Sequence, residues 1–235
     1  MEGNSNSVTT NQDGIHPDLE EIVLKQCQNP WQGPLHQATK SAFQTILPHL
    51  KEYQNNWVLD SGCGVGDSTQ RLAVEYPNSL ILGVDRSEVR LNKADIKQKF
   101  NGRVHYLRAE LGDFWRLLVQ NQIHPIAHYI LYPNPYPKKH HIRKRFHGSS
   151  SIRELIQLSP KLELRSNWKL YLKEFQFAFK VALNETAKNK TTIVKLTQSK
   201  KLILDNNEPW TAFEKKFFHS QQELWKLECQ ILNKQ

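Results

Sequence analysis

The stretch Asp60-Ser-Gly-Cys-Gly-Val-Gly-Asp67 decides how this sequence is interpreted. It directly follows the apolar run Trp57-Val-Leu, which predicts a short buried strand. Gly62, Gly64 and Gly66 allow the backbone to turn tightly and to approach a ligand closely. Because ligands of doubly wound sheets bind at the carboxyl ends of the strands, the stretch predicts a ligand-binding loop at such an edge.

Strand and helix patterns alternate through the rest of the chain. The strand patterns cover residues 57–60, 79–85, 103–107, 127–132, 161–165, 191–196 and 223–232, and helical patterns cover 68–76, 88–100, 114–120 and 168–183. Before them, residues 16–50 are expected to form helical pieces that end near Pro48. The alternation predicts an α/β fold, a Rossmann-like and mostly parallel seven-stranded sheet with helices on both faces.

Length and composition limit the possible architectures. The 235 residues are enough for one sizeable core, and no repeat or linker divides them. We expect a single domain over residues 15–235, preceded by a small, polar and disordered tail over residues 1–14. No stretch approaches the ~20 apolar residues that a membrane span needs. Cys27, Cys63 and Cys229 form no C-x-x-C pair, which argues against a zinc site or disulfide framework and favours a reducing, cytoplasmic setting.

The spacing of the glycines narrows the class of ligand. A dinucleotide-binding fingerprint, G-x-G-x-x-G, needs a glycine where this chain has Asp67. An acidic residue just before G-x-G-x-G is instead the pattern of S-adenosylmethionine-dependent methyltransferases. In that pattern, Asp60 can face the positively charged methionine end of the cofactor. The alternative is a set of turn glycines and helix-capping acids that bind no ligand.

Acidic residues after the next two strands support a nucleoside ligand. Asp85 ends the second strand, nineteen residues after Gly66, where a carboxylate can accept hydrogen bonds from both ribose hydroxyls. Glu110 or Asp113 follows the third strand and is expected near the adenine. With these residues, S-adenosylmethionine is the expected cofactor.

The segment from Tyr132 to His147 follows the fourth strand and is rich in cations. Prolines at positions 133, 135 and 137 stiffen it and are expected to hold Asn134 and Tyr136 over the site. Its basic residues are Lys138, Lys139, His140, His141, Arg143, Lys144, Arg145 and His147. Together with a net charge of +9, this density of cations favours phosphate contacts to a nucleic acid.

Other interpretations of this segment stay open. A run of charges is most often a solvated face, and Tyr136 could serve packing alone. The pair His140-His141 has no companion carboxylate or cysteine at metal-site spacing, so no metal is expected.

Taken together, these motifs resemble the bacterial tRNA (guanine-N7)-methyltransferases, a family with a class I methyltransferase sheet. That family has P-D-P-W followed by Lys and a basic stretch, then T-D-W before a helix, then T-x-F-E near the C-terminus. This sequence has P-N-P-Y-P-K at 133–138, S-N-W at 166–168 and T-A-F-E at 211–214. The similarity runs from about residue 55 to the end of the sequence.

The resemblance implies methyl transfer from S-adenosylmethionine to N7 of a guanosine in the tRNA variable loop, by a monomer or homodimer. It implies cofactor contacts for Asp60, Gly62, Gly64, Gly66, Asp85, Glu110 and Asp113. It implies tRNA contacts for Lys138, His140, Arg143, Lys144 and Arg145. It also implies a nucleoside pocket lined by Asn167, Thr211, Phe213 and Glu214, and Tyr136 is available to stack on the target base.

Two positions depart from the family pattern. Asn134 stands where the family has its loop aspartate, and Asn167 stands where it has the aspartate of T-D-W. An amide keeps one acceptor but loses the charge and adds donors. Because guanine N7 has a lone pair and no proton, the reaction needs positioning more than a general base, and Asn134 is expected to hold the base. The alternatives are a methyltransferase of another substrate, whether small molecule, protein or other RNA, and a cofactor- and RNA-binding paralogue without catalysis.

Overall fold

The computed structural model describes residues 5–53, 56–96, 99–100, 102–186, 192–196 and 200–233. The chain forms two compact units. The glycine-loop unit consists of Gly33–Leu131 and Leu158–Leu162, and the basic-loop unit consists of the chain up to Gln32, Tyr132–Gln157 and the chain from Glu163 onward. The single domain expected over residues 15–235 stays a prediction.

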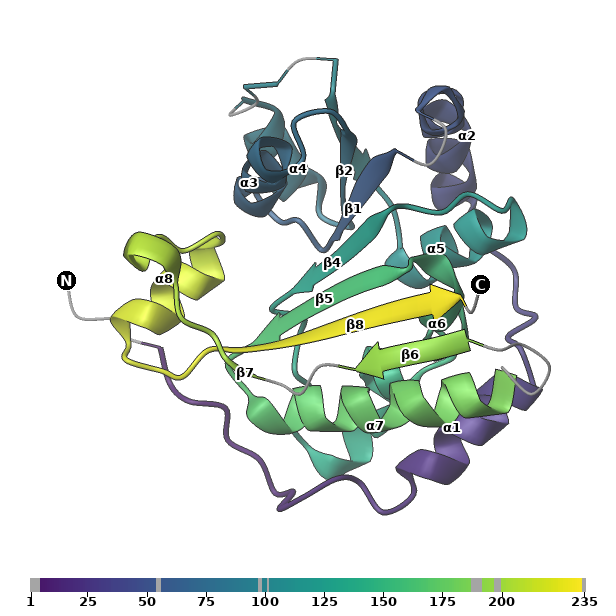
Figure 1. Ribbon diagram of the computed structural model, residues 1–235, viewed down its shortest axis with the longest axis vertical. Coiled ribbons are helices and arrows are strands. Elements are labelled where there is room, and N and C mark those ends of the chain that lie inside the picture. Colours follow the sequence, from purple (N-terminus) through teal and green to yellow (C-terminus); the bar gives the residue numbers. More distant parts are fainter. Residues whose placement is uncertain are drawn as a thin grey trace. The chain divides into compact units, whose positions relative to one another are not determined.

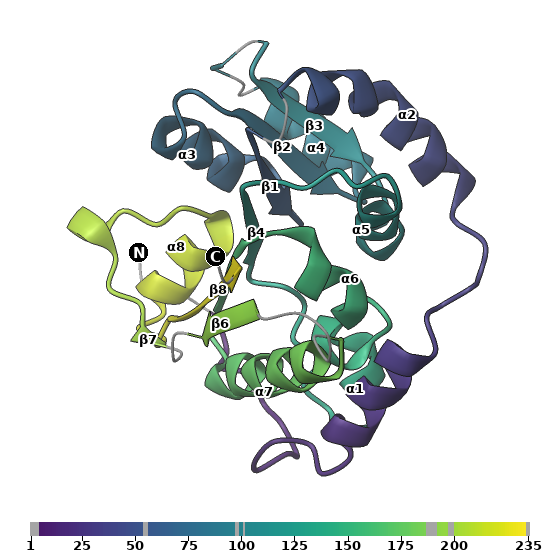
Figure 2. The ribbon, with the colours of Figure 1, turned by 45° about the vertical axis from the view of Figure 1, so that its right-hand side comes forward.

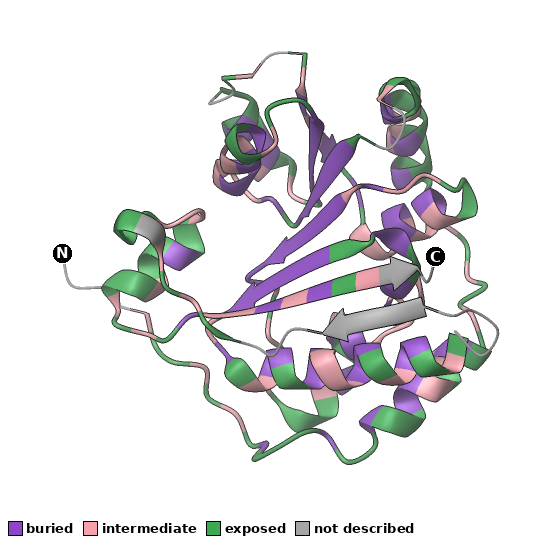
Figure 3. Cartoon of the chain, in the orientation of Figure 1, coloured by how far each residue is buried: buried purple, intermediate pink, exposed green. Residues whose placement is uncertain are grey.

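A parallel sheet of four strands forms the centre of the glycine-loop unit (Figures 1 and 2). The strands lie in the order β3 (Val104–Arg108), β2 (Leu80–Asp85), β1 (Trp57–Ser61) and β4 (Ala127–Leu131). Every residue of β1, β2 and β4 is buried (Figure 3), which is typical of parallel strands. In this register Asp60 pairs with Gly83, so β1 and β2 end at the same edge of the sheet.

Four helices accompany these strands. They are α2 (Gln37–Glu52), α3 (Asp67–Glu75), α4 (Glu88–Ile96) and α5 (Leu111–Gln120). Phe43 of α2 meets Phe114 of α5 edge to face, with ring centroids 6.0 Å apart. The expected end of α2 near Pro48 is wrong, because the helix continues to Glu52. Leu50, beyond the proline, is 1% exposed, and its burial favours continuing the helix despite the hydrogen bond that a proline removes.

The basic-loop unit combines helices from both ends of the sequence. α1 (Leu19–Gln28) lies beside α7 (Lys169–Thr186), where Gln28 Nε2 donates to Glu185 Oε1 at 3.2 Å. Its shorter helices are α6 (Ile152–Leu158), α8 (Ala212–His219) and the 3-10 turns η1 (Lys139–Lys144), η2 (Phe146–Gly148) and η3 (Asp205–Asn207). Of the helices in the described part of the chain, none combines the length and the apolarity needed to cross a bilayer.

The strands of this unit include antiparallel pairs. β6 (Thr192–Leu196) and β7 (Lys200–Lys201) each pair antiparallel with β8 (Trp225–Asn233). β5 (Lys161–Ser166) begins in the glycine-loop unit and continues into this one. The described residues hold eight strands, one more than expected, because β7 is two exposed lysines without an apolar pattern. The predicted α/β fold with a mostly parallel sheet is confirmed, although the expected strand start at residue 191 lies outside the described residues.

Two polar residues within the tail expected over residues 1–14 contact the rest of the basic-loop unit. Thr10 Oγ1 donates to the carbonyl of Pro137 at 2.6 Å, and Gln12 is 7% exposed. The Gln12 side chain donates to Glu174 Oε1 at 2.5 Å. Polar side chains anchor this segment, and a hydropathy pattern cannot reveal an anchor of that kind.

We expect Gly66→Ala to destabilise the protein by about 3 kcal/mol, more than a left-handed backbone alone would cost. Gly66 has φ +78°, and a Cβ there would lie 2.5 Å from Tyr106 Oη and 2.8 Å from Ala94 Cβ. Gly102→Ala is the matched control, because Gly102 has φ +80° with nothing within 4 Å of an added Cβ. It should cost about 1 kcal/mol. Urea unfolding measures both, and equal losses would contradict the steric explanation.

Candidate functional site

The loop between β1 and α3 is built from glycines with left-handed backbone. Gly62, Gly64 and Gly66 have φ values of +80°, +58° and +78°. Gly66 lies directly against Tyr106, whereas a Cβ on Gly62 or Gly64 would meet nothing within 4 Å. One glycine therefore allows α3 to begin close to the sheet. The other two leave open space next to the backbone, into which a ligand can fit.

Asp60 lies buried at the root of this loop, at 1% exposure. Its Oδ2 accepts hydrogen bonds from the hydroxyls of Ser68 and Thr69, each at 2.7 Å. Its Oδ1 is buried and has no hydrogen-bond partner among the described residues. Burial raises the pKa of Asp60 to about 6, although the two hydroxyls lower it in part. An unsatisfied buried oxygen is costly, so a cationic or hydrogen-bond-donating ligand would fit here.

Asp85 is brought to the same loop from the end of β2. Its Oδ2 accepts from the backbone N–H of Gly64 at 3.1 Å, and its Oδ1 accepts from that of Ser87 at 2.8 Å. Arg90 Nη1 lies 3.4 Å from Oδ2. A carboxylate offers about four acceptor positions, so after these three contacts acceptor capacity remains for a ribose hydroxyl. Asp60, the glycines and Asp85 thus meet as the sequence predicts, and they fit an adenosyl cofactor.

The two alternatives for the adenine position differ in their surroundings. Asp113 Oδ2 accepts from the backbone N–H of His36 at 2.7 Å and thereby caps the start of α2. Glu110 precedes α5 and has an exposed side chain, while its backbone N–H donates to Thr39 Oγ1 at 3.1 Å. The structure therefore favours Glu110 over Asp113 as a cofactor contact.

The basic loop, residues 133–145, presents some of its cations to solvent and buries others. Lys138, Lys139, His140, Arg143 and Lys144 are exposed, and His141 is half-buried. Arg145 and His147 are 0% exposed. The expectation that Arg145 contacts tRNA is therefore corrected, because its guanidinium lies inside the unit. No three His, Cys, Asp or Glu side chains gather as a metal site would require, within the part of the chain that the structure describes.

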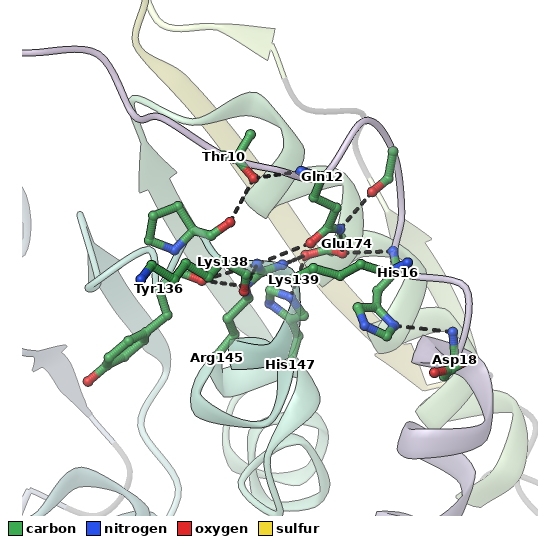
Figure 4. Close-up of polar contacts among 12 residues, drawn as sticks. Thr10, Gln12, His16, Asp18, Tyr136, Lys138, Lys139, Arg145, His147 and Glu174 are labelled. Atoms are coloured by element: carbon green, nitrogen blue, oxygen red, sulfur yellow. Dashed lines mark hydrogen bonds and ion pairs between the residues drawn. The ribbon is translucent and has the colours of Figure 1, made fainter.

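A buried ion pair explains the position of Arg145 (Figure 4). Its guanidinium donates to Glu174 Oε2, and also to the carbonyls of Tyr136 at 3.1 Å and Lys138 at 3.3 Å. His147 Nε2 lies 3.1 Å from the same Glu174 oxygen. Burial favours the neutral acid, yet the hydrogen bond to His147 and the charge of Arg145 outweigh it and lower the pKa of Glu174 to about 2.

A second buried carboxylate, Glu214, holds the other end of the basic loop. It accepts from Tyr132 Oη at 2.7 Å, from Arg165 Nη1 at 3.0 Å and from the backbone N–H of Trp210 at 2.5 Å. Thr211 Oγ1 accepts from the N–H of Glu214 at 2.9 Å and caps α8. Thr211 and Glu214 thus stabilise the fold. Glu214 is 0% exposed, which argues against its expected place in a nucleoside pocket, and the expectation for Thr211 stays a prediction.

The other residues predicted to contact the substrate nucleoside have exposed or half-buried side chains. Asn134 is exposed, and its Oδ1 accepts from the backbone N–H of Tyr136 at 3.3 Å. Tyr136 is half-buried, and its ring centroid lies 6.0 Å from Lys144 Nζ. Phe213 is 52% exposed. Asn167 is half-buried and donates through Nδ2 to Gln222 Oε1 at 2.8 Å.

The sequence predictions missed Glu174, although its spacing carried a signal. Glu174 follows Tyr171 by three residues and precedes Ala178 by four, and both neighbours are buried on α7. An acid on the apolar stripe of a helix must find a buried partner. Only the partner, Arg145, could not be found in this way.

A protein-family model matches most of the chain. The family model Methyltransf_4, described as "Putative methyltransferase", matches residues 54–227. Solved methyltransferases share the fold at low identity. The 16S rRNA methyltransferase KamB has a TM-score of 0.53 and 16% identity, over 81% of this chain and 94% of that chain. The aminoglycoside resistance methyltransferase NpmB1 has a TM-score of 0.52 and 12% identity, over 80% of this chain and 93% of that chain.

Curated relatives match parts of the chain. It is 23% identical over 175 residues to the tRNA (guanine-N(7)-)-methyltransferase of Aquifex aeolicus, which is 73% of this chain and 55% of that protein. It is 31% identical over 101 residues to the protein of the same name from Neorickettsia sennetsu, which is 41% of this chain and 44% of that protein. It is 42% identical over 74 residues to the trans-aconitate 2-methyltransferase of Deinococcus radiodurans, which is 32% of this chain and 26% of that protein. The chain thus spans between 26% and 55% of the length of these relatives.

The family match carries the assignment, because it extends from the residues just before β1 into β8. It agrees with the three short motifs that suggested a tRNA (guanine-N7)-methyltransferase-like chain, and it supports S-adenosylmethionine as the cofactor of the glycine loop. The chain belongs to this methyltransferase family.

Proposed function

We propose that this chain is an S-adenosylmethionine-dependent methyltransferase that modifies N7 of a guanosine in the variable loop of tRNA. The observation that carries the proposal is the exposed cationic turn η1, reached through the proline-stiffened segment that directly follows β4. β4 pairs with β1, the strand whose end forms the glycine loop. The chain therefore runs from the strand beside the cofactor strand directly into a surface of cations.

The exposed cations suit an RNA backbone. Lys138, Lys139, Arg143 and Lys144 lie within seven consecutive residues, and their side chains are open to solvent. Phosphate contacts from such residues position a nucleic acid without reading its sequence. Two of the curated relatives described above carry the name tRNA (guanine-N(7)-)-methyltransferase, which adds support for tRNA as the substrate.

The chemistry asks little of a general base. Guanine N7 carries a lone pair and no proton, and S-adenosylmethionine supplies a methyl group on a sulfonium that needs no further activation. The protein's task is to hold the base in line and to exclude water. Asn134 offers an amide acceptor and two donors for the base edge, and the ring of Tyr136 is available for stacking.

The charge of the cofactor matches the state of Asp60. The methionine end of S-adenosylmethionine carries an ammonium and a sulfonium. A cation next to Asp60 favours its carboxylate form and opposes the burial that raises its pKa to about 6. Cofactor binding therefore competes with protonation of Asp60. The negative charge of Asp85 also raises the pKa of Asp60 and so strengthens this competition.

A methyltransferase that acts on another substrate is the second candidate. The 74-residue similarity to a trans-aconitate 2-methyltransferase favours it, because that relative is named for a small carboxylic acid. Asn134 and Asn167, in place of two family acids, point in the same direction. A binding paralogue without catalysis is the third.

Incubation with radiolabelled S-adenosylmethionine and bulk tRNA separates these candidates. We expect label in 7-methylguanosine after nucleoside digestion. Asn134→Ala should lower the transfer rate at least about tenfold while S-adenosylmethionine affinity stays within about twofold, because the proposed role of Asn134 is to hold the base and not the cofactor. Asn134→Asp, which keeps the acceptor for the Tyr136 N–H, should retain transfer. Label in another nucleoside or in a small acid would contradict guanine-N7 transfer, and cofactor binding without any transfer would support the paralogue.

Reversing two exposed charges tests the RNA surface. Arg143→Glu with Lys144→Glu should weaken tRNA binding at least about tenfold and reduce the slope of log K against log salt by about 2, because two phosphate contacts are lost. Lys173→Glu with Lys180→Glu, an equal change of charge on the exposed side of α7, is the control and should alter both quantities much less. A filter-binding salt titration measures both quantities. Equal effects of the two double variants would show that the basic loop contributes only through the net charge of the protein.

The affinity for S-adenosylmethionine should fall as the pH drops through about 6, by up to about tenfold per pH unit below it. The physical reason is proton competition at Asp60, whose folded-state pKa is raised. Isothermal titration calorimetry across this range measures the effect. Asp60→Asn should bind more weakly and without this pH dependence. It should unfold no more easily than the wild type at neutral pH, because an ionised buried Asp60 costs stability there. An unchanged pH profile in Asp60→Asn would exclude Asp60 as the titrating group.

A further inference from the structure

Three consecutive side chains near the N-terminus contact the basic loop. Thr10 Oγ1 donates to the carbonyl of Pro137 at 2.6 Å (Figure 4). Asn11 Oδ1 accepts from the backbone N–H of Lys139 at 2.9 Å. Thr10 and Asn11 thus reach the loop just before η1 and at its first residue.

Gln12 reaches the end of the same loop (Figure 4). Its Oε1 accepts from Arg145 Nη2 at 3.1 Å, and its Nε2 donates to Glu174 Oε1 at 2.5 Å. The backbone N–H of His16 donates to the same Glu174 oxygen at 2.9 Å. Gln12 therefore contacts both partners of the buried ion pair, and the backbone of His16 adds a second N-terminal contact to Glu174.

These contacts satisfy groups that the loop does not satisfy by itself. Lys139 is the first residue of η1, and the first N–H groups of a helical turn have no partner within the turn. Asn11 supplies that partner from a residue 128 positions away in the chain. The Gln12 amide similarly completes the hydrogen bonding of Arg145 and Glu174, for which an unmet bond inside the unit would be costly.

The exposed turn η1 has few stabilising interactions of its own, because the buried contacts of Arg145 lie beyond its last residue. Lys138, Lys139, Arg143 and Lys144 repel one another, and each is exposed. Ile142, at 4% exposure, is the loop's buried apolar side chain within η1. Ordering this turn costs conformational entropy, and a single buried isoleucine offsets little of it.

We propose that Thr10, Asn11 and Gln12 form an N-terminal brace that orders the basic loop before RNA binds. The RNA half of this inference rests on the proposed function. Preordering lowers the entropy cost of binding and so raises affinity. The brace side chains are uncharged, so they order the cations without neutralising them. The segment lies outside residues 54–227, the range that the family model matches.

The brace is tested with a double variant and a matched control in the same segment. Thr10→Val with Asn11→Ala removes the two hydrogen bonds to the loop, together with the hydrogen bond that Thr10 Oγ1 accepts from the Gln12 N–H at 3.1 Å, and it changes neither Arg145 nor Glu174. Thr9→Val with Asn6→Ala makes the same chemical changes at exposed positions. Thr10→Ser keeps the hydroxyl and serves as the conservative variant. All are the full chain, with unfolding midpoints measured alongside.

Hydrogen–deuterium exchange of the peptide that spans Lys138–Arg145 reports loop order without RNA. We expect exchange in Thr10→Val/Asn11→Ala to be at least about fivefold faster than in the wild type, since each lost hydrogen bond weakens the ordered state about that much. The KM for tRNA should rise about three- to tenfold with kcat within about twofold. The affinity for S-adenosylmethionine should be unchanged, and both control variants should behave as the wild type.

The outcomes separate the brace from the proposed function. Unchanged exchange in the double variant overturns the brace. Faster exchange with an unchanged KM for tRNA overturns its role in RNA binding. If the wild type neither binds nor methylates tRNA, the proposed function fails together with the RNA half, and the exchange rates alone decide whether the brace orders the loop. Equal effects from Thr9→Val/Asn6→Ala would show a general loosening of the segment and would overturn the assignment to Thr10 and Asn11.

Discussion

The ion pair between Arg145 and Glu174 is the interaction on which the basic-loop unit depends. Both side chains are fully buried, and removing either would leave an uncompensated charge at a cost of about 3–5 kcal/mol. Arg145 directs its other donors to the carbonyls of the basic loop, while Glu174 accepts from Gln12, His16 and His147. One buried pair thus fixes the N-terminal segment, the basic loop and η2 onto α7.

Glu214 repeats this use of a buried acid at the other end of the loop. It holds Tyr132, whose φ is +55°, where the chain turns out of β4. With Glu174 at one end and Glu214 at the other, the loop is anchored where it begins and where it ends. The exposed lysines between the anchors make few contacts of their own, so buried carboxylates determine where surface cations project. Those cations are what the proposed RNA contact uses.

Asp60 is a buried acid used in the opposite way. Glu174 has an arginine partner, and its pKa is lowered to about 2, whereas Asp60 has only hydroxyl donors and its pKa is raised to about 6. One Asp60 oxygen is left without a hydrogen-bond partner among the described residues. A saturated acid stabilises the fold, and an unsaturated one at the end of a strand is available to a ligand. This difference in hydrogen bonding separates the structural carboxylates of the chain from the candidate cofactor contact.

The sequence by itself determined the parallel strands and the glycine loop, because buried strands require apolar runs and left-handed turns require glycines at fixed spacing. It also predicted that Asp60 and Asp85 lie at the ends of adjacent strands, where the structure has them. Only the tertiary structure distinguished Arg145 from its neighbour Lys144, or made Thr211 and Glu214 structural. The physical reason is that a charged residue can be buried only beside its partner. Glu174 lies 29 residues from Arg145, and Glu214 lies 82 residues from Tyr132, distances that no local pattern spans.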